Sequence, residues 1–352
     1  MRMSWTMQRM WACSPAAALG LGVAGCGGGG GGGDDTGTVA RIDITSANRD
    51  SVSHASAASM LAFSPASGLA TMSGAAGSDS RAALSVGFSQ LPAWAGRVLG
   101  AMRQPPDVAR ALDGGSRMRP LAVTGPIEEA CMVSGSVAVT FDDRDNNLAP
   151  SAGDGLTIQF KQCRDSESET VDGLAVVTYT AVSPPPTLSL SARMTLTELS
   201  NAAVGHALKL NGSMLLDFVQ TGPTTAVSKL TAVGAVVATV TTHEFSDTVT
   251  LHSGFREEAS HDSVAGRTTS TISGSLESVA AGGIVDVSSV AGAPIVNDDV
   301  EDYPTAGAVR VRGRTGTLLM TALPTQAVRL ELDANDDGSA ESSETVSWDW
   351  LL

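Results

Sequence analysis

The sequence is poor in aromatic and basic residues. Only 4% of its 352 residues are aromatic, and 22 Lys and Arg stand against 37 Asp and Glu, which leaves a formal net charge of −15. Because nucleic-acid phosphates and anionic lipid surfaces attract Lys and Arg, this deficit argues against a nucleic-acid-binding protein and against a polybasic membrane-binding protein. Such acidity instead suits solubility and the binding of divalent cations.

Long apolar runs and catalytic motifs are missing as well. Beyond the N-terminus no apolar run reaches the roughly 18 residues of a membrane-spanning helix. The sequence has no GxSxG, HExxH, CxxC or P-loop pattern, and Ser and Asp are too abundant to single out a catalytic triad. The sequence therefore predicts no catalytic residue and leans towards a protein that is not an enzyme.

The N-terminus carries the features of an export signal. A short basic segment precedes the apolar stretch 11–25, which ends in small residues before Cys26. The segment VAGC, residues 23–26, resembles the lipobox of bacterial lipoproteins. The resemblance implies that residues 1–25 are a signal peptide and that Cys26 is the first mature residue, with acyl chains on its sulfur and amino group. An ordinary signal peptide with a small-residue cleavage region is the alternative.

An unbroken run of glycines, Gly27–Gly33, follows the cysteine directly. Glycine brings no side chain to a core, so this run predicts a flexible tether with a reach of roughly 15 Å. Each buried CH₂ of an acyl chain contributes about 0.8 kcal/mol to membrane binding. Because glycine rather than aspartate follows Cys26, the lipoprotein resemblance implies the outer membrane. We therefore expect a protein of the bacterial cell envelope whose membrane partner is bound through an N-terminal lipid anchor.

The rest of the chain divides into two regions. Residues 26–125 predict a tether and a low-complexity region rich in Ala, Ser and Gly, with a short helix over 91–104. From residue 126 to residue 352 the hydrophobic period is two, which predicts a β domain. This division predicts three segments: a signal peptide, a weakly structured N-terminal region and one β domain.

Alternating apolar residues mark the strands of the β domain. The pattern is clearest over residues 133–141, 156–160, 188–196, 208–218 and 328–332. Alternation of this kind indicates strands with one buried and one wet face, as in antiparallel sheets. The sequence therefore predicts a mostly β fold, either an antiparallel sandwich or a curved half-barrel sheet.

Two cysteines remain once the leader and Cys26 are set aside. Cys131 and Cys163 flank a predicted hairpin, and pairing Phe141 with Leu156 brings the two within one bulge of each other. In an oxidising compartment a disulfide here would stabilise the fold by about 2–4 kcal/mol. Two unpaired buried thiols are the alternative.

One motif carries metal chemistry. The stretch DANDDGSAESSE resembles an EF-hand calcium loop, with glycine at position 6. Positions 1, 3, 5, 7, 9 and 12 hold Asp333, Asn335, Asp337, Ser339, Glu341 and Glu344. Alternate oxygens at this spacing converge on one hard cation, so calcium is the expected cofactor. The loop departs from the family at Ala340 and follows a strand rather than a helix, so a solvated hairpin turn is the alternative.

A second acidic stretch has a weaker form of the same spacing. Asp143, Asp145 and Asn147 occupy positions 1, 3 and 5, and Asp154 occupies position 12. Leu148 stands where the turn glycine belongs. A long hairpin loop kept soluble by its charges is the alternative to a second calcium site.

Two stretches, 131–160 and the part that begins at Pro304, loosely resemble segments of uncharacterised proteobacterial lipoproteins, a group with no established activity. The leading hypothesis is therefore a lipid-anchored envelope protein that presents a non-catalytic binding or structural β module, stabilised by calcium. A carrier of a hydrophobic ligand in a half-barrel groove and a secreted hydrolase with a dispersed site are the alternatives.

Overall fold

The computed structural model describes residues 39–63, 123–147, 150–164, 167, 169–183, 188–203, 205–298, 301 and 303–352. The expected signal peptide, Cys26, the glycine run and the helix expected over 91–104 lie outside these residues. The described residues belong to one compact unit, which begins at Val39.

Strands dominate the described residues, where seventeen of them form one sheet. The strands are β1 (Val123–Ala130), β2 (Ser134–Asp142), β3 (Gly155–Arg164), β4 (Glu169–Ser183), β5 (Ser189–Ala203), β6 (His206–Gln220), β7 (Thr225–Ala232), β8 (Val236–Thr241), β9 (Ser246–Leu251), β10 (Arg256–Asp262), β11 (Arg267–Ser278), β12 (Gly283–Ser289), β13 (Ile295–Asp298), β14 (Ala308–Arg312), β15 (Thr317–Leu323), β16 (Ala327–Asp333) and β17 (Ser342–Ser347). Two helices accompany them in the described part of the chain, α1 (Arg49–Phe63) and α4 (Trp348–Leu351).

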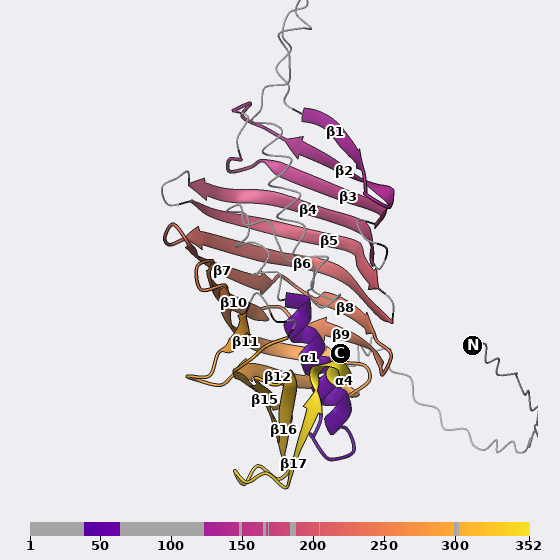
Figure 1. Ribbon diagram of the computed structural model, residues 1–352, viewed down its shortest axis with the longest axis vertical. Coiled ribbons are helices and arrows are strands. Elements are labelled where there is room, and N and C mark those ends of the chain that lie inside the picture. Colours follow the sequence, from indigo (N-terminus) through magenta and orange to yellow (C-terminus); the bar gives the residue numbers. More distant parts are fainter. Residues whose placement is uncertain are drawn as a thin grey trace, which may run out of the picture. The chain divides into compact units, whose positions relative to one another are not determined.

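The sheet is an antiparallel meander, in which strands that follow one another in sequence lie side by side (Figure 1). The two halves of β6 pair with β8 and β7, so these two short strands act as one interrupted strand. The pairs β9 and β10, and β12 and β13, line up along β11 in the same way. The prediction of a mostly antiparallel β fold is confirmed, and its strands form a single sheet rather than two.

The period of two in the sequence corresponds to the buried and exposed faces of the strands. In β6 the alternate residues Leu208, Leu210, Met214 and Leu216 are all buried. The same holds in β16, where every second residue from Val328 is buried. Alternation places one set of side chains against the core and the other in solvent, so the sequence pattern fixes which face of each strand is buried.

A line of β-bulges crosses several neighbouring strands, and we call it the bulge line. Gln162 in β3 and Glu198 in β5 are extra residues in the left-handed region, with φ of 50° and 51°. At the same level β7 and β8 are separated by residues 233–235, and β9 and β10 by residues 252–255. Each extra residue shifts the pairing register and bends its strand.

Neighbouring strands carry the residues that accommodate these bulges. The side chain of Asp172 accepts a hydrogen bond from the backbone N–H of Gln162 (3.3 Å), and that of Asn211 accepts one from Glu198 (2.7 Å). A glycine follows each acceptor, and Gly173 lets the Glu198 backbone approach closely. An Asx-Gly pair therefore satisfies the bulge on one side of its strand and makes room on the other.

The predicted disulfide joins Cys131 and Cys163, whose Cα atoms lie 5.5 Å apart. It lies beside the bulge at Gln162, where the pairing of β2 with β3 shifts by one residue. Before this shift, the alternation of buried and exposed residues that the sequence predicted for β2 no longer holds. Val133, expected on the buried face, precedes β2 and is 41% exposed.

Helix α1 lies in the stretch that the sequence pattern assigned to a linker or a loosely packed region. Most of its side chains from Val52 to Met60 are buried. Three buried serines donate their hydroxyls to helix carbonyls, for example Ser56 to Val52 O at 2.7 Å. A helix of small residues that is buried all round shows no amphipathic period, so the pattern gave no signal for it.

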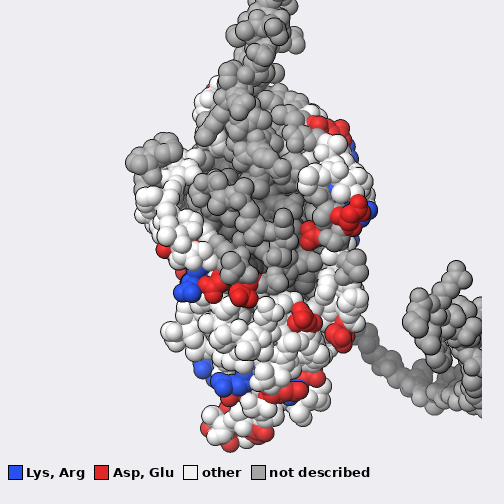
Figure 2. Space-filling model, viewed as in Figure 1, with Lys and Arg blue, Asp and Glu red and all other residues white. Residues whose placement is uncertain are grey.

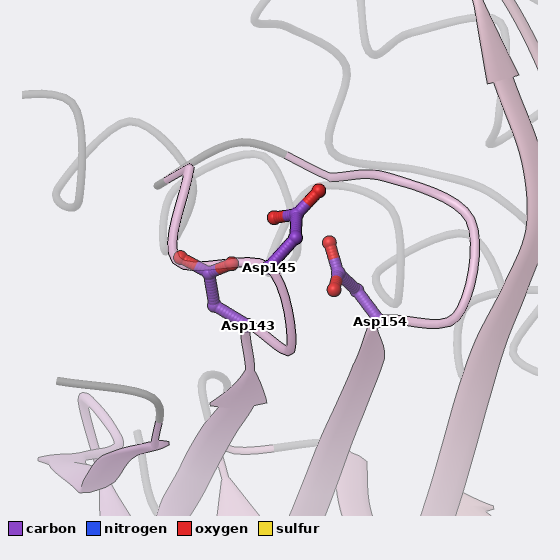
Figure 3. A group of neighbouring side chains, drawn as sticks. All are labelled: Asp143, Asp145 and Asp154. Atoms are coloured by element: carbon purple, nitrogen blue, oxygen red, sulfur yellow. The ribbon is translucent and has the colours of Figure 1, made fainter. Parts of the chain in front are cut away.

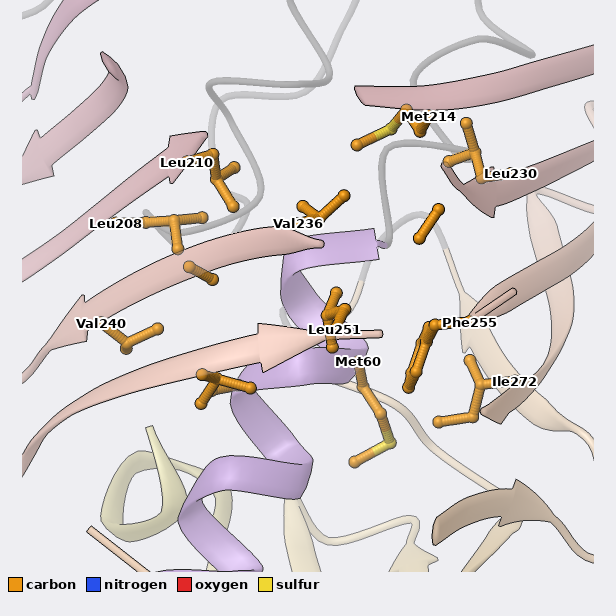
Figure 4. Packing of buried hydrophobic residues seen from close by; sticks show 14 of the residues in the cluster. Met60, Leu208, Leu210, Met214, Leu230, Val236, Val240, Leu251, Phe255 and Ile272 are labelled. Carbon is orange, nitrogen blue, oxygen red and sulfur yellow. The ribbon is translucent and has the colours of Figure 1, made fainter. Parts of the chain in front are cut away.

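This helix packs on the sheet and on the C-terminal residues. It contacts β8, β9, β11, β15 and α4, and Figure 4 shows Met60 on the side of α1 where Phe255 and Ile272 lie. His54 contacts the Leu351 carbonyl oxygen through Nδ1 (3.0 Å), and its ring stacks on Phe245. The helix therefore joins the sheet to the C-terminus. Neither described helix is long and apolar enough to cross a membrane.

The segment before α1 is also fixed to the sheet. Ile284 N donates to Ala40 O (3.1 Å), and Ile44 N donates to Thr315 O (2.8 Å). Three glycines, at positions 283, 313 and 316, leave room for this segment, because a Cβ on any of them would meet its backbone. Ion pairs of Arg41 with Asp286 and of Arg314 with Asp43 lie alongside.

Gly173→Ala is expected to lower the free energy of unfolding by about 2–6 kcal/mol. Its φ of +108° disfavours a side chain, which costs about 1–3 kcal/mol, and the new Cβ would lie 2.3 Å from Glu198 O, which adds about 1–3 kcal/mol of overpacking. Urea unfolding followed by circular dichroism measures the loss. Gly234→Ala is the matched control, since its φ is +83° but nothing lies within 4 Å of its Cβ. Equal losses in the two variants would contradict the close approach at the bulge line.

Candidate functional site

On the face shown in Figure 2, the acidic side chains of the described residues are distributed rather than gathered in one patch. They form separate small groups, several with a basic side chain beside them. Ion pairs such as Lys209 with Glu198 and Arg267 with Asp298 account for part of this pattern. Two acidic groups differ, because in each of them three carboxylates converge.

The first acidic group lies in the loop between β2 and β3, which we call the 143–154 loop. Asp143 follows the end of β2, Asp154 precedes β3, and Asp145 lies between them (Figure 3). One carboxylate oxygen from each lies within 4.8 Å of the others. Asp143 and Asp154 are buried, whereas Asp145 is exposed. Carboxylate oxygens at this spacing match the ligands of a hard divalent cation.

Backbone and hydroxyl groups hold these carboxylates in place. Asp154 accepts hydrogen bonds from Arg144 N (2.9 Å) and Ser151 N (2.7 Å). Asn147 N donates to Asp143 Oδ1 and to Asp145 Oδ1, both at 3.2 Å. The loop therefore positions its carboxylates through its own backbone.

Two pKa shifts follow from this geometry. The Ser151 hydroxyl donates to Asp145 and lowers the pKa of that carboxyl, which favours its charged form. Burial, together with the nearby charge of Asp154, raises the pKa of Tyr179 to about 12. The loop thus keeps negative charge next to a buried, neutral phenol.

The second acidic group lies in the loop between β16 and β17, which we call the 333–341 loop. Oxygens of Asp333, Asp337 and Glu341 lie within 4.8 Å of one another, and all three residues are more exposed than Asp143 and Asp154. Glu341 also accepts a hydrogen bond from Ala334 N (2.7 Å). This group is the more open of the two.

Both loops form the same turn. Asp337 N donates to Asp333 Oδ1 (3.2 Å) and to Asn335 Oδ1 (2.8 Å), as Asn147 N does to the first and third positions of the other loop. The fourth position is left-handed in both, with φ of 57° at Asn146 and 59° at Asp336. Gly338, at the sixth position, has a φ of 88°. Two loops at distant points of the chain therefore share these hydrogen bonds and a left-handed fourth residue over their first five positions.

Among the other expected ligands of this site, one lies apart from the loop. Glu344, expected to close the second site, lies in β17 and pairs with Arg49 at the start of α1 (2.7 Å). Ser339 N donates to Asp337 Oδ1, so this residue lies within the turn. The structure brings together three of the six expected side chains as a cluster and adds Asn335 as a hydrogen-bond acceptor within the same turn.

The spacing of residues in the sequence motifs did not point to two further residues, Asp336 and Glu257, that the structure singles out. Asp336 accepts hydrogen bonds from Gly316 N and Thr317 Oγ1, both at 3.0 Å, and so fixes the 333–341 loop to the β14–β15 turn. Glu257 in β10 is 3% exposed, and burial raises the pKa of its carboxyl to about 8 despite a hydrogen bond from Ser270. The only sequence signal for Glu257 was its place in an alternating strand, at a position that faces inward.

A comparison with protein-family models, with curated proteins and with solved structures found no match for this chain. The geometry of the described residues is therefore the basis of the proposals that follow.

Glu257→Gln is expected to stabilise the protein increasingly as pH rises from 5 to 8. The carboxyl has a higher pKa in the folded state, about 8, than the ordinary value of 4.5. Its contribution to stability is therefore complete below pH 4.5 and declines up to pH 8, by at most about 1.4 kcal/mol per pH unit. Glutamine does not titrate and lacks this decline.

Urea unfolding of both proteins at pH 5, 6.5 and 8 measures the difference. Glu258→Gln is the matched control, because the neighbouring Glu258 points to the exposed face of the same strand. A constant difference between Glu257→Gln and the parent across this range would show that the folded carboxyl titrates normally.

Proposed function

We propose that the protein is a lipid-anchored component of the bacterial cell envelope whose β domain is a non-catalytic binding or structural module stabilised by calcium. The observation that carries the calcium part is that three carboxylates converge in each of the 143–154 and 333–341 loops, on a turn that matches over its first five residues. The anchor part rests on the lipobox-like segment and on the glycine run.

The organisation of the chain supports the anchor. The compact unit begins at Val39, shortly after the glycines end. Residues 40–44 are then fixed to the sheet by backbone hydrogen bonds. A tether needs a flexible stretch followed by a firm attachment. The glycine run is suited to the first, and the hydrogen bonds of residues 40–44 to the sheet are suited to the second. Acylation at Cys26 would hold the domain near the outer membrane, and Gly27–Gly33 would separate the two by roughly 15 Å.

The chemistry of the two loops supports calcium. Calcium takes six to eight oxygen ligands, and each loop offers three carboxylates towards that number. The like charges of three neighbouring carboxylates repel one another, and a divalent cation relieves that repulsion. Extracellular modules of this kind bind calcium at about 10⁻⁴–10⁻³ M. We therefore expect weak sites that are occupied only where calcium is abundant.

Calcium is expected to raise the thermal midpoint of the protein by a few degrees. At 10 mM calcium a site with a dissociation constant of about 10⁻³ M stabilises the folded state by about 1.4 kcal/mol. Scanning calorimetry with calcium and with EDTA measures the shift, and isothermal titration measures the number of sites.

Asp145→Ala and Asp337→Ala are each expected to remove one site, and the double variant is expected to show no calcium shift. Glu244→Ala, which changes an exposed carboxylate outside both loops, is the control and should keep the full shift. An unchanged midpoint of the parent at millimolar calcium would refute the calcium part and leave the anchor untouched.

Cys26→Ser is expected to abolish acylation and to move the protein from the membrane fraction to the soluble fraction. Intact-mass analysis of the protein expressed in a bacterial host reports both the acyl mass and the cleavage site. Cys13→Ser, within the expected leader, is the control and should yield a normally acylated product. An acylated product from Cys26→Ser is incompatible with the anchor.

A further inference from the structure

A small cavity lies beneath α1 at the point where the helix, the sheet and the C-terminus meet. Its walls come from α1, β10, β11, β13 and the first residue of α4. They include Ala57, Met60, Glu257, Ser270, Asn297 and Trp348. Figure 4 shows one side of this region, with Met60 on the side of α1 where Ile272 lies. The cavity is thus lined by parts of the chain that are distant in sequence.

Two of the residues that line this cavity each carry a polar atom without a hydrogen-bond partner in the described part of the protein. Glu257 Oε2 and Trp348 Nε1 are both buried, and their residues are each 3% exposed. The Ser270 side chain forms a hydrogen bond with the carboxyl group of Glu257. An unpaired buried polar group costs about 1–3 kcal/mol, so two at one cavity are a feature that calls for a shared partner. One of the two atoms is an obligatory donor, and the other belongs to a carboxyl group that can accept.

The size of the cavity limits what that partner can be. The space open to the centre of a water molecule is about 20 Å³. One water needs roughly 10–15 Å³ on this measure, together with two to four polar neighbours. The cavity therefore has room for a single water and is too small for an organic ligand.

We propose that this cavity binds one ordered water molecule, which accepts a hydrogen bond from Trp348 Nε1 and forms a second with Glu257 Oε2. The site goes beyond the envelope function and depends on neither the anchor nor the calcium loops. Asn297, which also lines the cavity, offers a third polar side chain.

Water fits the chemistry of the walls better than an ion of similar size. The indole N–H only donates and so repels a cation at the position it points to. An anion would lie against the carboxyl oxygens of Glu257. Water alone accepts from the indole and bonds to the carboxyl in either protonation state. The bridge would connect β10 to the first residue of α4 and so help to hold the C-terminal residues against α1.

The experiment is a measurement of water contacts on the ¹⁵N-labelled, deuterated full chain carrying Cys26→Ser. The indole N–H signal of Trp348 is assigned by its loss in Trp348→Phe. Nuclear Overhauser spectra in the laboratory and rotating frames are then recorded at the water frequency. We expect a cross-peak from the Trp348 indole proton to water, with opposite signs in the two frames, as a long-lived bound water gives.

Three variants test the bridge. Glu257→Leu is expected to abolish the cross-peak, because the water loses its second partner. Glu257→Gln is expected to keep it, which excludes magnetisation relayed through a carboxyl proton. Ser270→Ala is also expected to keep it, which excludes relay through that hydroxyl. Absence of the cross-peak in the Cys26→Ser parent, or its persistence in Glu257→Leu, would overturn the proposal.

A stability measurement gives an independent readout. Glu257→Leu and Trp348→Phe each remove one partner of the same water, so their effects should not add. The shift of the urea midpoint in the double variant is expected to be smaller than the sum of the two single shifts. Additive shifts, together with no water cross-peak, would mean that the two side chains are independent.

Discussion

The structure depends on the way its strands remain hydrogen-bonded across the bulge line. The extra residue of a bulge has no ladder partner for its backbone N–H, and an unmade hydrogen bond has a cost. Asp172 and Asn211 remove this cost by accepting from the bulged residues of the preceding strand. The glycine after each of them then gives space on the opposite side. The bulges can therefore continue from strand to strand, and the whole sheet bends without losing its ladder.

Much of this fold can be predicted from the sequence. Apolar and polar residues alternate along a strand because successive side chains point to opposite faces of the sheet. Leu156, Ile158 and Phe160 are buried and so fix the inward face of β3, and the cysteine pair follows from the same hairpin. The bulge line is harder to predict. In a sequence Asp-Gly and Asn-Gly usually indicate hairpin turns, whereas here they lie in the middle of β4 and β6. Only the pairing of neighbouring strands shows that they serve bulges.

The helix and the acidic loops show two other limits of the sequence pattern. Helix α1 is built from small residues that are buried on every side, so tertiary packing and not periodicity selects it. For the loops, the spacing pointed to Asp333 and Asp337, whose carboxylates lie close together in the structure. It did not reveal that Arg49 binds Glu344, because α1 brings that arginine from nearly three hundred residues away. The local geometry of a loop can thus be predicted from the sequence. An ion pair that draws one of its side chains towards a distant residue cannot.

The β14–β15 turn relates the two halves of the proposed function. Asp43, in the segment that leaves the tether, pairs with Arg314 and accepts from Thr315 N (3.2 Å) and Thr315 Oγ1 (2.8 Å). On the other side of the same turn, Asp336 of the 333–341 loop accepts from Gly316 N. Ordering that loop around a cation would therefore also restrain the turn that receives the chain from its anchor. In the proposed lipoprotein, any pull on the lipid reaches the sheet at a point that the acidic loop supports.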